Sequence, residues 1–233
     1  MKKYLKLILL IFTLLSIYFI YQKTKEKNII YLPLGDTFLI SEEYNYLDIV
    51  TEELKENQKL RFSTQEYLNS EQSLLSLYQD IKYNKKIEIE EKEMNIRHLL
   101  REANLLTLSI GLNDLREEVH KQKEIDLQTG HEIIANIENR LDQTINEIEK
   151  YYKGDIYLIG FYDLYPSNKE KSIMIKKLNI MYREYVKRND IIFIDISDFR
   201  YQENLLYSMG NYLLLKEEGS KELARRILVL LKE

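Results

Sequence analysis

Cysteine is absent from the 233-residue chain, and proline and histidine occur only two and three times. The lack of cysteine excludes a disulfide framework, a thiolate nucleophile and a cysteine-based metal site. The composition is 45% hydrophobic and 31% charged, which is typical of a globular protein and too apolar for a disordered chain. Apart from a short N-terminal segment, the length suits one domain with a single core.

An excess of positive charge is also missing. The net charge is −4, and residues 1–27 contribute six Lys against one Glu, so the rest of the chain is more acidic than the whole. An acidic domain repels phosphate backbones, and we therefore expect no nucleic-acid partner. The plainest interpretation of this charge is solubility.

A long uncharged run lies near the N-terminus. It extends from Leu7 to Tyr21, and with three preceding residues the span 4–21 approaches the ~17–25 residues that cross a bilayer. The small residues of a signal-peptide cleavage site are missing, because the first Gly and the first Ala come much later in the chain. A buried core helix is the alternative, but the run is apolar on every face. We predict that residues 1–27 form a membrane anchor and that 28–233 form the folded domain.

The orientation of this anchor depends on the flanking lysines. Three Lys precede the apolar run and three follow it before residue 28, so the positive-inside bias is weak. The short positive N-terminus resembles that of a signal anchor, which favours a cytoplasmic N-terminus. We expect a single-pass protein of the cell membrane with its domain on the extracellular side.

Short apolar runs alternate with amphipathic stretches along the rest of the chain. This alternation predicts a three-layer α/β/α domain with a parallel sheet that helices cover on both faces. The predicted strands are 28–34, 59–62, 105–110, 155–160 and 190–196. The predicted helices are 42–56, 71–83, 91–102, 130–152, 168–188 and 217–231, and 84–93 is a charge-rich, solvated connection.

The carboxyl ends of three predicted strands carry motifs in a particular order. The first strand ends in Gly-Asp-Thr (IIYLPLGDTF), the third in Gly-Leu-Asn-Asp (LLTLSIGLNDL), and a late strand ends in Asp (IIFIDISDF). In this order the set resembles the SGNH/GDSL hydrolases, the GDSL esterases and lipases, from about Asn28 to the C-terminus. The resemblance implies a flavodoxin-like fold and a cleft at the carboxyl edge of the sheet.

The resemblance also implies roles for four residues. Thr37 stands at the position of the nucleophilic Ser, and Asn113 at that of the oxyanion-hole Asn. The last motif, D-x-x-H, maps onto Asn211 for the acid and Leu214 for the base. No Gly occurs between Asp36 and Ile110 to supply the second oxyanion donor. A Thr hydroxyl without a base is a poor nucleophile, so these substitutions predict weak activity or none.

The three histidines offer little to replace the missing base. His98 lies on a predicted helix and His131 near a helix start, so both are expected at the surface. His120 follows the Asn113 motif and is the one candidate for a replacement base. Asp36 is expected to cap a loop or helix, and Asp195 to organise loops. The acidic residues show no metal-ligand spacing, so we expect neither metal nor cofactor.

Three functions remain open at this point. The first is a catalytically degenerate SGNH-like domain that binds an acyl or glycan ligand or organises an envelope protein. The second is a divergent esterase, lipase or deacetylase that uses Thr37 on acyl esters. The third is a structural partner in a membrane complex with no ligand pocket.

The anchor makes a direct prediction. Full-length protein should partition with membranes because of the run from Leu7 to Tyr21, and deletion of residues 1–27 should release a soluble, folded domain. Membrane fractionation of both forms tests this. Full-length protein that stays soluble without detergent, or a mature N-terminus after residue 21, would contradict the anchor. Protection of the domain from protease on intact cells would contradict the orientation.

Overall fold

A computed structural model describes residues 13, 16, 29–41, 43–57, 59–89, 91–122 and 124–231. Apart from Thr13 and Ser16, the expected anchor lies outside the described residues. Among the residues that are described, no helix is both long and apolar enough to cross a bilayer.

The centre of the domain is a five-stranded parallel sheet in the order β2-β1-β5-β6-β7. This confirms the predicted parallel sheet. The bounds of each predicted strand differ from those of the observed strand by at most two residues. The order reverses between β1 and β5, which is the switch point where open α/β sheets form their crevices. The strands are β1 (Ile29–Gly35), β2 (Leu60–Ser63), β5 (Leu105–Ser109), β6 (Ile156–Ile159) and β7 (Ile191–Ile194).

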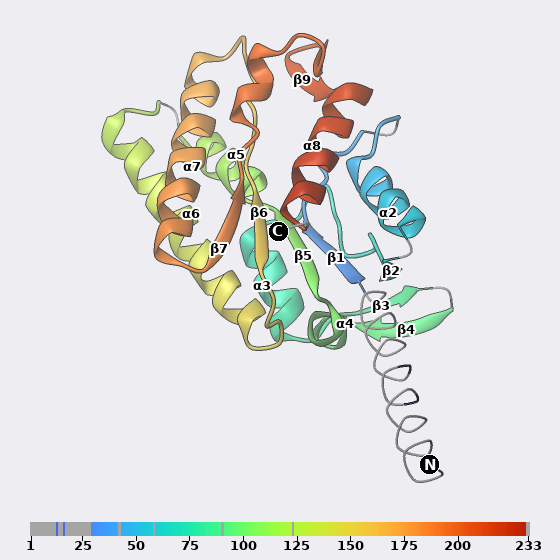
Figure 1. Ribbon diagram of the computed structural model, residues 1–233. Helices are drawn as coiled ribbons and strands as arrows, with labels where there is room; N and C mark the ends of the chain where they lie inside the picture. The colour runs from blue at the N-terminus through green and yellow to red at the C-terminus, as the bar shows by residue number, and fades with distance from the viewer. Residues whose placement is uncertain are drawn as a thin grey trace, which may run out of the picture.

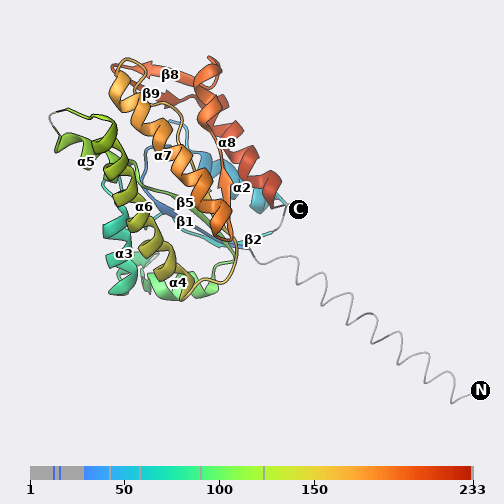
Figure 2. The same ribbon diagram turned by 90° about the vertical axis from the view of Figure 1, so that its left-hand side faces the viewer.

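Helices cover both faces of the sheet (Figures 1 and 2). Helices α2 and α8 pack together on one face, whereas α3, α6 and α7 cover the other, with α5 beside α6 and α7 at the carboxyl edge. Six helices match predicted ones, but α5 and a short 3₁₀ turn, η1, were not predicted. The helices are α2 (Tyr46–Glu56), α3 (Leu74–Lys82), α4 (Ile96–Glu102), α5 (Leu112–His120), α6 (Leu127–Glu149), α7 (Lys169–Arg188), η1 (Ser197–Tyr201) and α8 (Glu217–Leu230).

Two antiparallel hairpins were also not predicted. The first joins β3 (Lys86–Ile89) to β4 (Lys92–Asn95) and replaces both the expected solvated connection 84–93 and the start of the predicted helix 91–102, so α4 begins only at Ile96. The charged residues of β3 alternate with Ile in the period of two of a half-exposed strand, and the charge obscured that pattern. The second hairpin joins β8 (Leu206–Met209) to β9 (Tyr212–Leu215) by a two-residue turn in which Gly210 has φ +61°.

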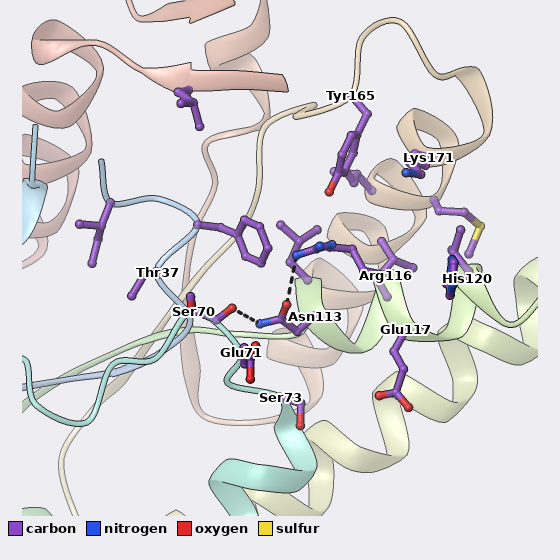
Figure 3. A pocket seen from close by; sticks show the side chains of 18 of the residues that line it. Thr37, Ser70, Glu71, Ser73, Asn113, Arg116, Glu117, His120, Tyr165 and Lys171 are labelled. Atoms are coloured by element: carbon purple, nitrogen blue, oxygen red, sulfur yellow. Dashed lines mark hydrogen bonds between the residues drawn. The ribbon is translucent and has the colours of Figure 1, made fainter. Parts of the chain in front are cut away.

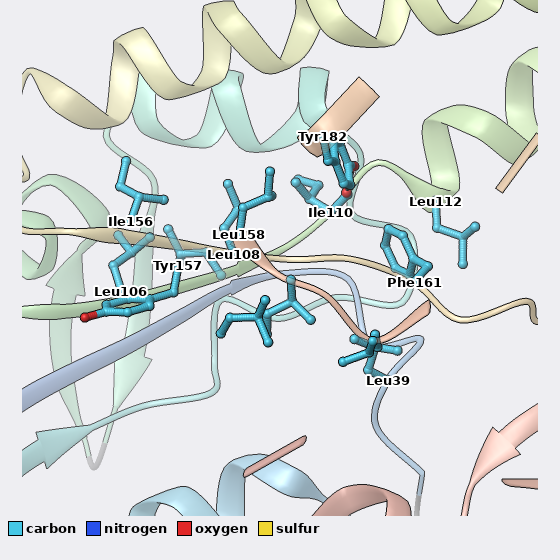
Figure 4. Close-up of a cluster of buried hydrophobic side chains, with 14 of the residues drawn as sticks. Leu39, Leu106, Leu108, Ile110, Leu112, Ile156, Tyr157, Leu158, Phe161 and Tyr182 are labelled. Carbon is cyan, nitrogen blue, oxygen red and sulfur yellow. The ribbon is translucent and has the colours of Figure 1, made fainter. Parts of the chain in front are cut away.

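The core lies between the sheet and its two helical layers. Figure 4 shows Leu106, Leu108 and Leu158 of the central strands among side chains from the flanking segments. All five residues of β5 and all four of β6 are buried, which explains their continuous apolar sequences. Tyr182 of α7 is fully buried and donates its hydroxyl to the carbonyl of Ile110, which fixes α7 to the end of β5.

A buried carboxylate connects three helices near the carboxyl edge. Asp114 of α5 is 1% exposed and accepts a hydrogen bond from the first backbone amide of α3, that of Leu74, at 2.8 Å. Its other oxygen accepts from Arg140 of α6 at 3.3 Å, and Arg140 also pairs with Glu118 at 2.9 Å. Thr144 donates to the carbonyl of Leu74 at 3.1 Å. These contacts set the positions of α3, α5 and α6 relative to one another.

This arrangement predicts that Asp114→Ala lowers the free energy of unfolding by ~2–4 kcal/mol. The change leaves a buried amide without an acceptor and removes one partner of a buried charge pair. Urea unfolding measures the effect. The matched control is Asp80→Ala, which removes a more exposed ion pair with Lys85 and should cost ~1 kcal/mol or less. Equal losses in both variants would contradict this role of Asp114.

Candidate functional site

A pocket of about 920 Å³ opens at the carboxyl edge of the sheet (Figure 3). Its walls come from the segment after β1, the segment before α3, helix α5, the start of α7 and strand β9. The volume lies within the usual range for small-molecule sites. Thr37, Asn113 and Leu214 all line it, as do Phe38, Ile40, Ser70, Glu71, Ser73, Leu112, Leu115, Arg116, Glu117, Val119, His120, Gln122, Tyr165, Lys171, Met174 and Ile175.

Thr37 lies in a turn rather than at a helix N-terminus. The turn is closed by a hydrogen bond from the Ile40 amide to the Thr37 carbonyl at 2.9 Å. The helix expected from residue 42 begins only at Tyr46, because Asn45 caps it by accepting from the Leu47 amide. The Thr37 hydroxyl makes no hydrogen bond to any described residue.

Two glycines hold the motif segments in place. Gly35 has φ +118°, and a Cβ there would lie 1.8 Å from the carbonyl oxygen of Ser109. This closeness lets the Asp36 amide donate to that same oxygen at 2.7 Å. Gly111 has φ +105° at the start of α5, where a Cβ would meet the hydroxyl of Tyr182. Both backbone positions require glycine, for steric reasons that are independent of catalysis.

The side-chain amide of Asn113 is already engaged. It donates to the carbonyls of Ser70 and Gln72, each at 2.9 Å, and so fixes the segment before α3. An amide nitrogen has two hydrogens, and these two bonds use both. The reverse orientation would point its oxygen at two carbonyls, so the assignment is determined by the contacts. In this geometry Asn113 has no hydrogen left for an oxyanion.

Leu214 faces the pocket from β9, but Asn211 does not line it. Asn211 lies exposed in the hairpin turn beside Gly210, where it lines a smaller cavity of about 200 Å³. The two cavities share Tyr165 and Lys171, so they are neighbours. The expected base position therefore lines the same pocket as Thr37, whereas the expected acid position, in the turn before β9, lies outside that pocket.

His120 lines the same pocket at the far end from Thr37, as Figure 3 shows. It follows Asn113 by seven residues on α5, which is ~10 Å along a helix axis. No described residue donates a hydrogen bond to its ring or accepts one from it. His98 and His131 do not line the pocket. Within the described ranges, no three His, Cys, Asp or Glu side chains cluster as metal ligands would.

Sequence reasoning missed Arg116, Lys171 and Tyr165 in the pocket wall. The Arg116 guanidinium lies 5.1 Å from the centre of the Phe38 ring, and the Lys171 ammonium lies 4.9 Å from that of Tyr165. A signal for Arg116 existed, because Asn113, Arg116 and His120 have the spacing of one helical face. No such signal marks Tyr165 or Lys171, which reach the pocket through the folding of the segment after β6.

Asp36 is a buried acid beside the site. It is 2% exposed, its Oδ1 accepts from the Phe38 amide at 3.2 Å, and its Oδ2 has no partner in the described structure. Burial, aided by the nearby Asp114 carboxylate, raises the pKa of Asp36 to about 8, although the hydrogen bond from the Phe38 amide and the charge of Arg116 oppose the shift. Asp36 is therefore largely protonated at neutral pH. Asp195, by contrast, accepts from Arg183 at 2.8 Å and from the Ser197 amide at 2.9 Å, so it organises a loop.

Known structures share this architecture. A lipase from a goat rumen metagenome has a TM-score of 0.67 at 14% identity, over 86% of this chain and 96% of its own. A lipolytic protein of the G-D-S-L family from Veillonella parvula has a TM-score of 0.62 at 11% identity, over 88% and 99%. An acetylxylan esterase from Geobacillus stearothermophilus has a TM-score of 0.60 at 14% identity, over 86% and 93%. No protein-family model matches the sequence, and neither does any curated protein.

The chain therefore has the fold of the SGNH/GDSL hydrolases, and the predicted resemblance is confirmed at that level. The α/β architecture and its parallel sheet match those of lipases and esterases. The roles that the resemblance implies for Thr37, Asn113, Asn211 and Leu214 remain predictions.

The buried carboxyl of Asp36 predicts a pH-dependent stability. Its pKa is higher in the folded than in the unfolded chain, so the folded state binds more protons and unfolding becomes easier as the pH rises from about 4 to 8. The slope attributable to Asp36 is at most about 1.4 kcal/mol per pH unit. In Asp36→Asn, which resembles the protonated acid in shape, this slope should disappear.

Urea unfolding of both proteins at several values between pH 5 and 8 measures this effect. The raised pKa of Asp114, caused mainly by burial, acts in the same direction and is common to both proteins. Equal slopes in wild type and Asp36→Asn would contradict the raised pKa of Asp36.

Proposed function

We infer that this protein is a catalytically degenerate SGNH-like module that is anchored to the cell membrane and binds a ligand in the Thr37 pocket at the cell envelope. The observation that carries the inference is Leu214. This residue faces the same pocket as Thr37. An alkyl side chain cannot accept the proton of a hydroxyl, so Thr37 stays a protonated and weak nucleophile.

The state of the other site residues supports the same conclusion. The amide hydrogens of Asn113 are both bound to backbone carbonyls, and Asn211 lines a separate cavity. An oxyanion hole acts only through donors aimed at the developing charge. A chain that has lost base, acid and a free donor retains the pocket but not the chemistry.

A structural neighbour supports the assignment of the lost positions. Three structures of the Geobacillus stearothermophilus acetylxylan esterase are of catalytic mutants. One replaces a serine, one an aspartate, and one a histidine that follows this aspartate by three residues. Asn211 and Leu214 have this same spacing, and they lie about as far from Thr37 along the chain as that pair does from its serine. This similarity favours the interpretation of Asn211 and Leu214 as replaced catalytic residues.

The competing function is a divergent esterase, lipase or deacetylase that acts on acyl esters through Thr37. His120 is the residue that favours it, since it lines the pocket. Its place at the far end of the pocket argues against direct proton transfer, which requires hydrogen-bond reach or one intervening water.

We expect wild-type protein to hydrolyse short-chain aryl esters at the rate of buffer alone, and Thr37→Ala to give the same rate. Both follow from the missing base and the engaged Asn113 amide. Chromogenic acetate and butyrate esters with full-length protein in a nonionic detergent provide the measurement, with an active esterase as a positive control. Turnover well above buffer that Thr37→Ala abolishes would establish the competing function, and His120→Gln would then identify its base.

A further inference from the structure

The Thr37 pocket presents several donors that make no ion pair and at most one long hydrogen bond to the described residues. Arg116 forms no ion pair with any described carboxylate, and its one hydrogen bond, to the Asn113 Oδ1, is long at 3.5 Å. The Lys171 ammonium likewise forms no ion pair within the described ranges, although it lies over Tyr165. The hydroxyl of Tyr165 makes no described hydrogen bond, and in Figure 3 it points toward Arg116. These three groups surround one end of the pocket.

Several other arginines of the chain are neutralised by carboxylates. The side chains of Arg140, Arg183, Arg200 and Arg226 each pair with a carboxylate at 3.3 Å or less. The chain also has more acidic than basic residues, so partners for cations are plentiful. Arg116 and Lys171 line a cavity and form no ion pair within the described ranges, so they bring two positive charges to one end of the pocket wall.

Aromatic rings hold these cations without neutralising them. A ring attracts a cation through its quadrupole but carries no net charge, so Arg116 on Phe38 and Lys171 on Tyr165 stay positive and positioned. Burial raises the pKa of Tyr165, so its hydroxyl keeps its proton and stays a donor. A ligand group that accepts hydrogen bonds and carries negative charge fits this end of the pocket.

The opposite side of the pocket suits hydroxyl groups. Glu71 and the segment from Ser70 to Ser73 form the lower wall in Figure 3. Glu71 forms no ion pair with a described residue, so its oxygens are available to hydroxyl donors. Glu117, the other acid in the wall, pairs with Lys121 at 2.8 Å. The pocket therefore combines an anion-binding end with an acceptor-lined side.

We propose that the Thr37 pocket binds a phosphorylated sugar or polyol, with the phosphate between Arg116, Lys171 and Tyr165 and the hydroxyls toward Glu71. Two cations match the charge of a phosphate monoester, which is close to −2 at neutral pH, better than that of a single carboxylate. This proposal deepens the proposed function and rests on its claim that the pocket binds rather than hydrolyses.

The position of the pocket in the fold favours a ligand outside the anchoring bilayer. Strand β1 begins at Ile29, directly after the expected anchor, and ends at Gly35 beside the pocket. Seven residues of strand span ~20 Å or more, so the pocket lies at the end of β1 away from the anchor. A soluble or polymeric phosphate ester reaches this opening more easily than a headgroup of the same membrane.

Titration calorimetry with full-length protein in a nonionic detergent tests the proposal, with glycerol phosphate as the probe. Glycerol phosphate should bind, inorganic phosphate and glucuronate should bind more weakly, and glycerol should not bind. Arg116→Gln and Lys171→Gln should each weaken binding about tenfold or more, because each removes a charged donor. Higher salt should also weaken binding.

Two variants serve as matched controls. Arg101→Gln removes another exposed arginine that lies over a tyrosine ring, that of Tyr151, and Lys176→Gln removes an exposed lysine of α7. Neither residue lines the pocket, so both variants should bind glycerol phosphate like wild type. Thermal unfolding of all four variants shows that any loss of binding is not a loss of fold.

Several results would overturn the proposal. They are glucuronate or glycerol binding as tightly as glycerol phosphate, pocket variants that bind like wild type, or controls that lose as much. Binding to phosphatidylglycerol vesicles that glycerol phosphate does not compete would also overturn it. The ester assay is independent of these outcomes. Hydrolysis through Thr37 would refute the proposed function, whereas failure to bind phosphate refutes only this choice of ligand.

Discussion

The organisation of the carboxyl edge depends on one buried carboxylate. Asp114 accepts from the first amide of α3 and from Arg140 of α6 while it belongs to α5 itself. Its neighbour Asn113 binds two carbonyls of the segment before α3. The two adjacent side chains together fix the floor of the pocket. The Asn-Asp pair of the motif therefore connects α5 to α3, to the segment before α3 and to α6.

Much of the sheet could be predicted from sequence because parallel strands buried on both faces appear as continuous apolar runs. Strands β5 and β6 are buried along their whole length, and nearly all of their residues are apolar. The unpredicted elements are those with mixed surroundings. Helix α5 has Leu112 and Leu115 inside and Arg116 and His120 outside, over only nine residues. The hairpin of β8 and β9 carries a turn signal, Gly210 between apolar runs, but this signal overlaps the residues matched to the D-x-x-H motif.

The candidate site was only partly predictable for a different reason. Motif order predicts that the four matched residues gather at one edge, because the carboxyl ends of parallel strands meet there. Thr37, Asn113 and Leu214 do line one pocket, but Asn211 lines only the neighbouring cavity. The engagement of Asn113 could not be foreseen, since its two acceptors come from a segment about forty residues earlier in the chain. Nor could the cations on Phe38 and Tyr165, whose rings approach only after folding. Sequence identifies which residues reach an edge, and packing decides what they do there.

The register of the β8 and β9 hairpin decides which side chain of β9 reaches the pocket. Each pairing in that ladder, from Leu206 with Leu215 to Met209 with Tyr212, fixes which side every residue of β9 presents. A shift of β9 by one residue would turn Leu214 to the opposite face and present a neighbouring side chain to the cavity. Substitutions within β9 leave this orientation unchanged, so the backbone ladder and its two-residue turn decide which position of the strand lines the pocket.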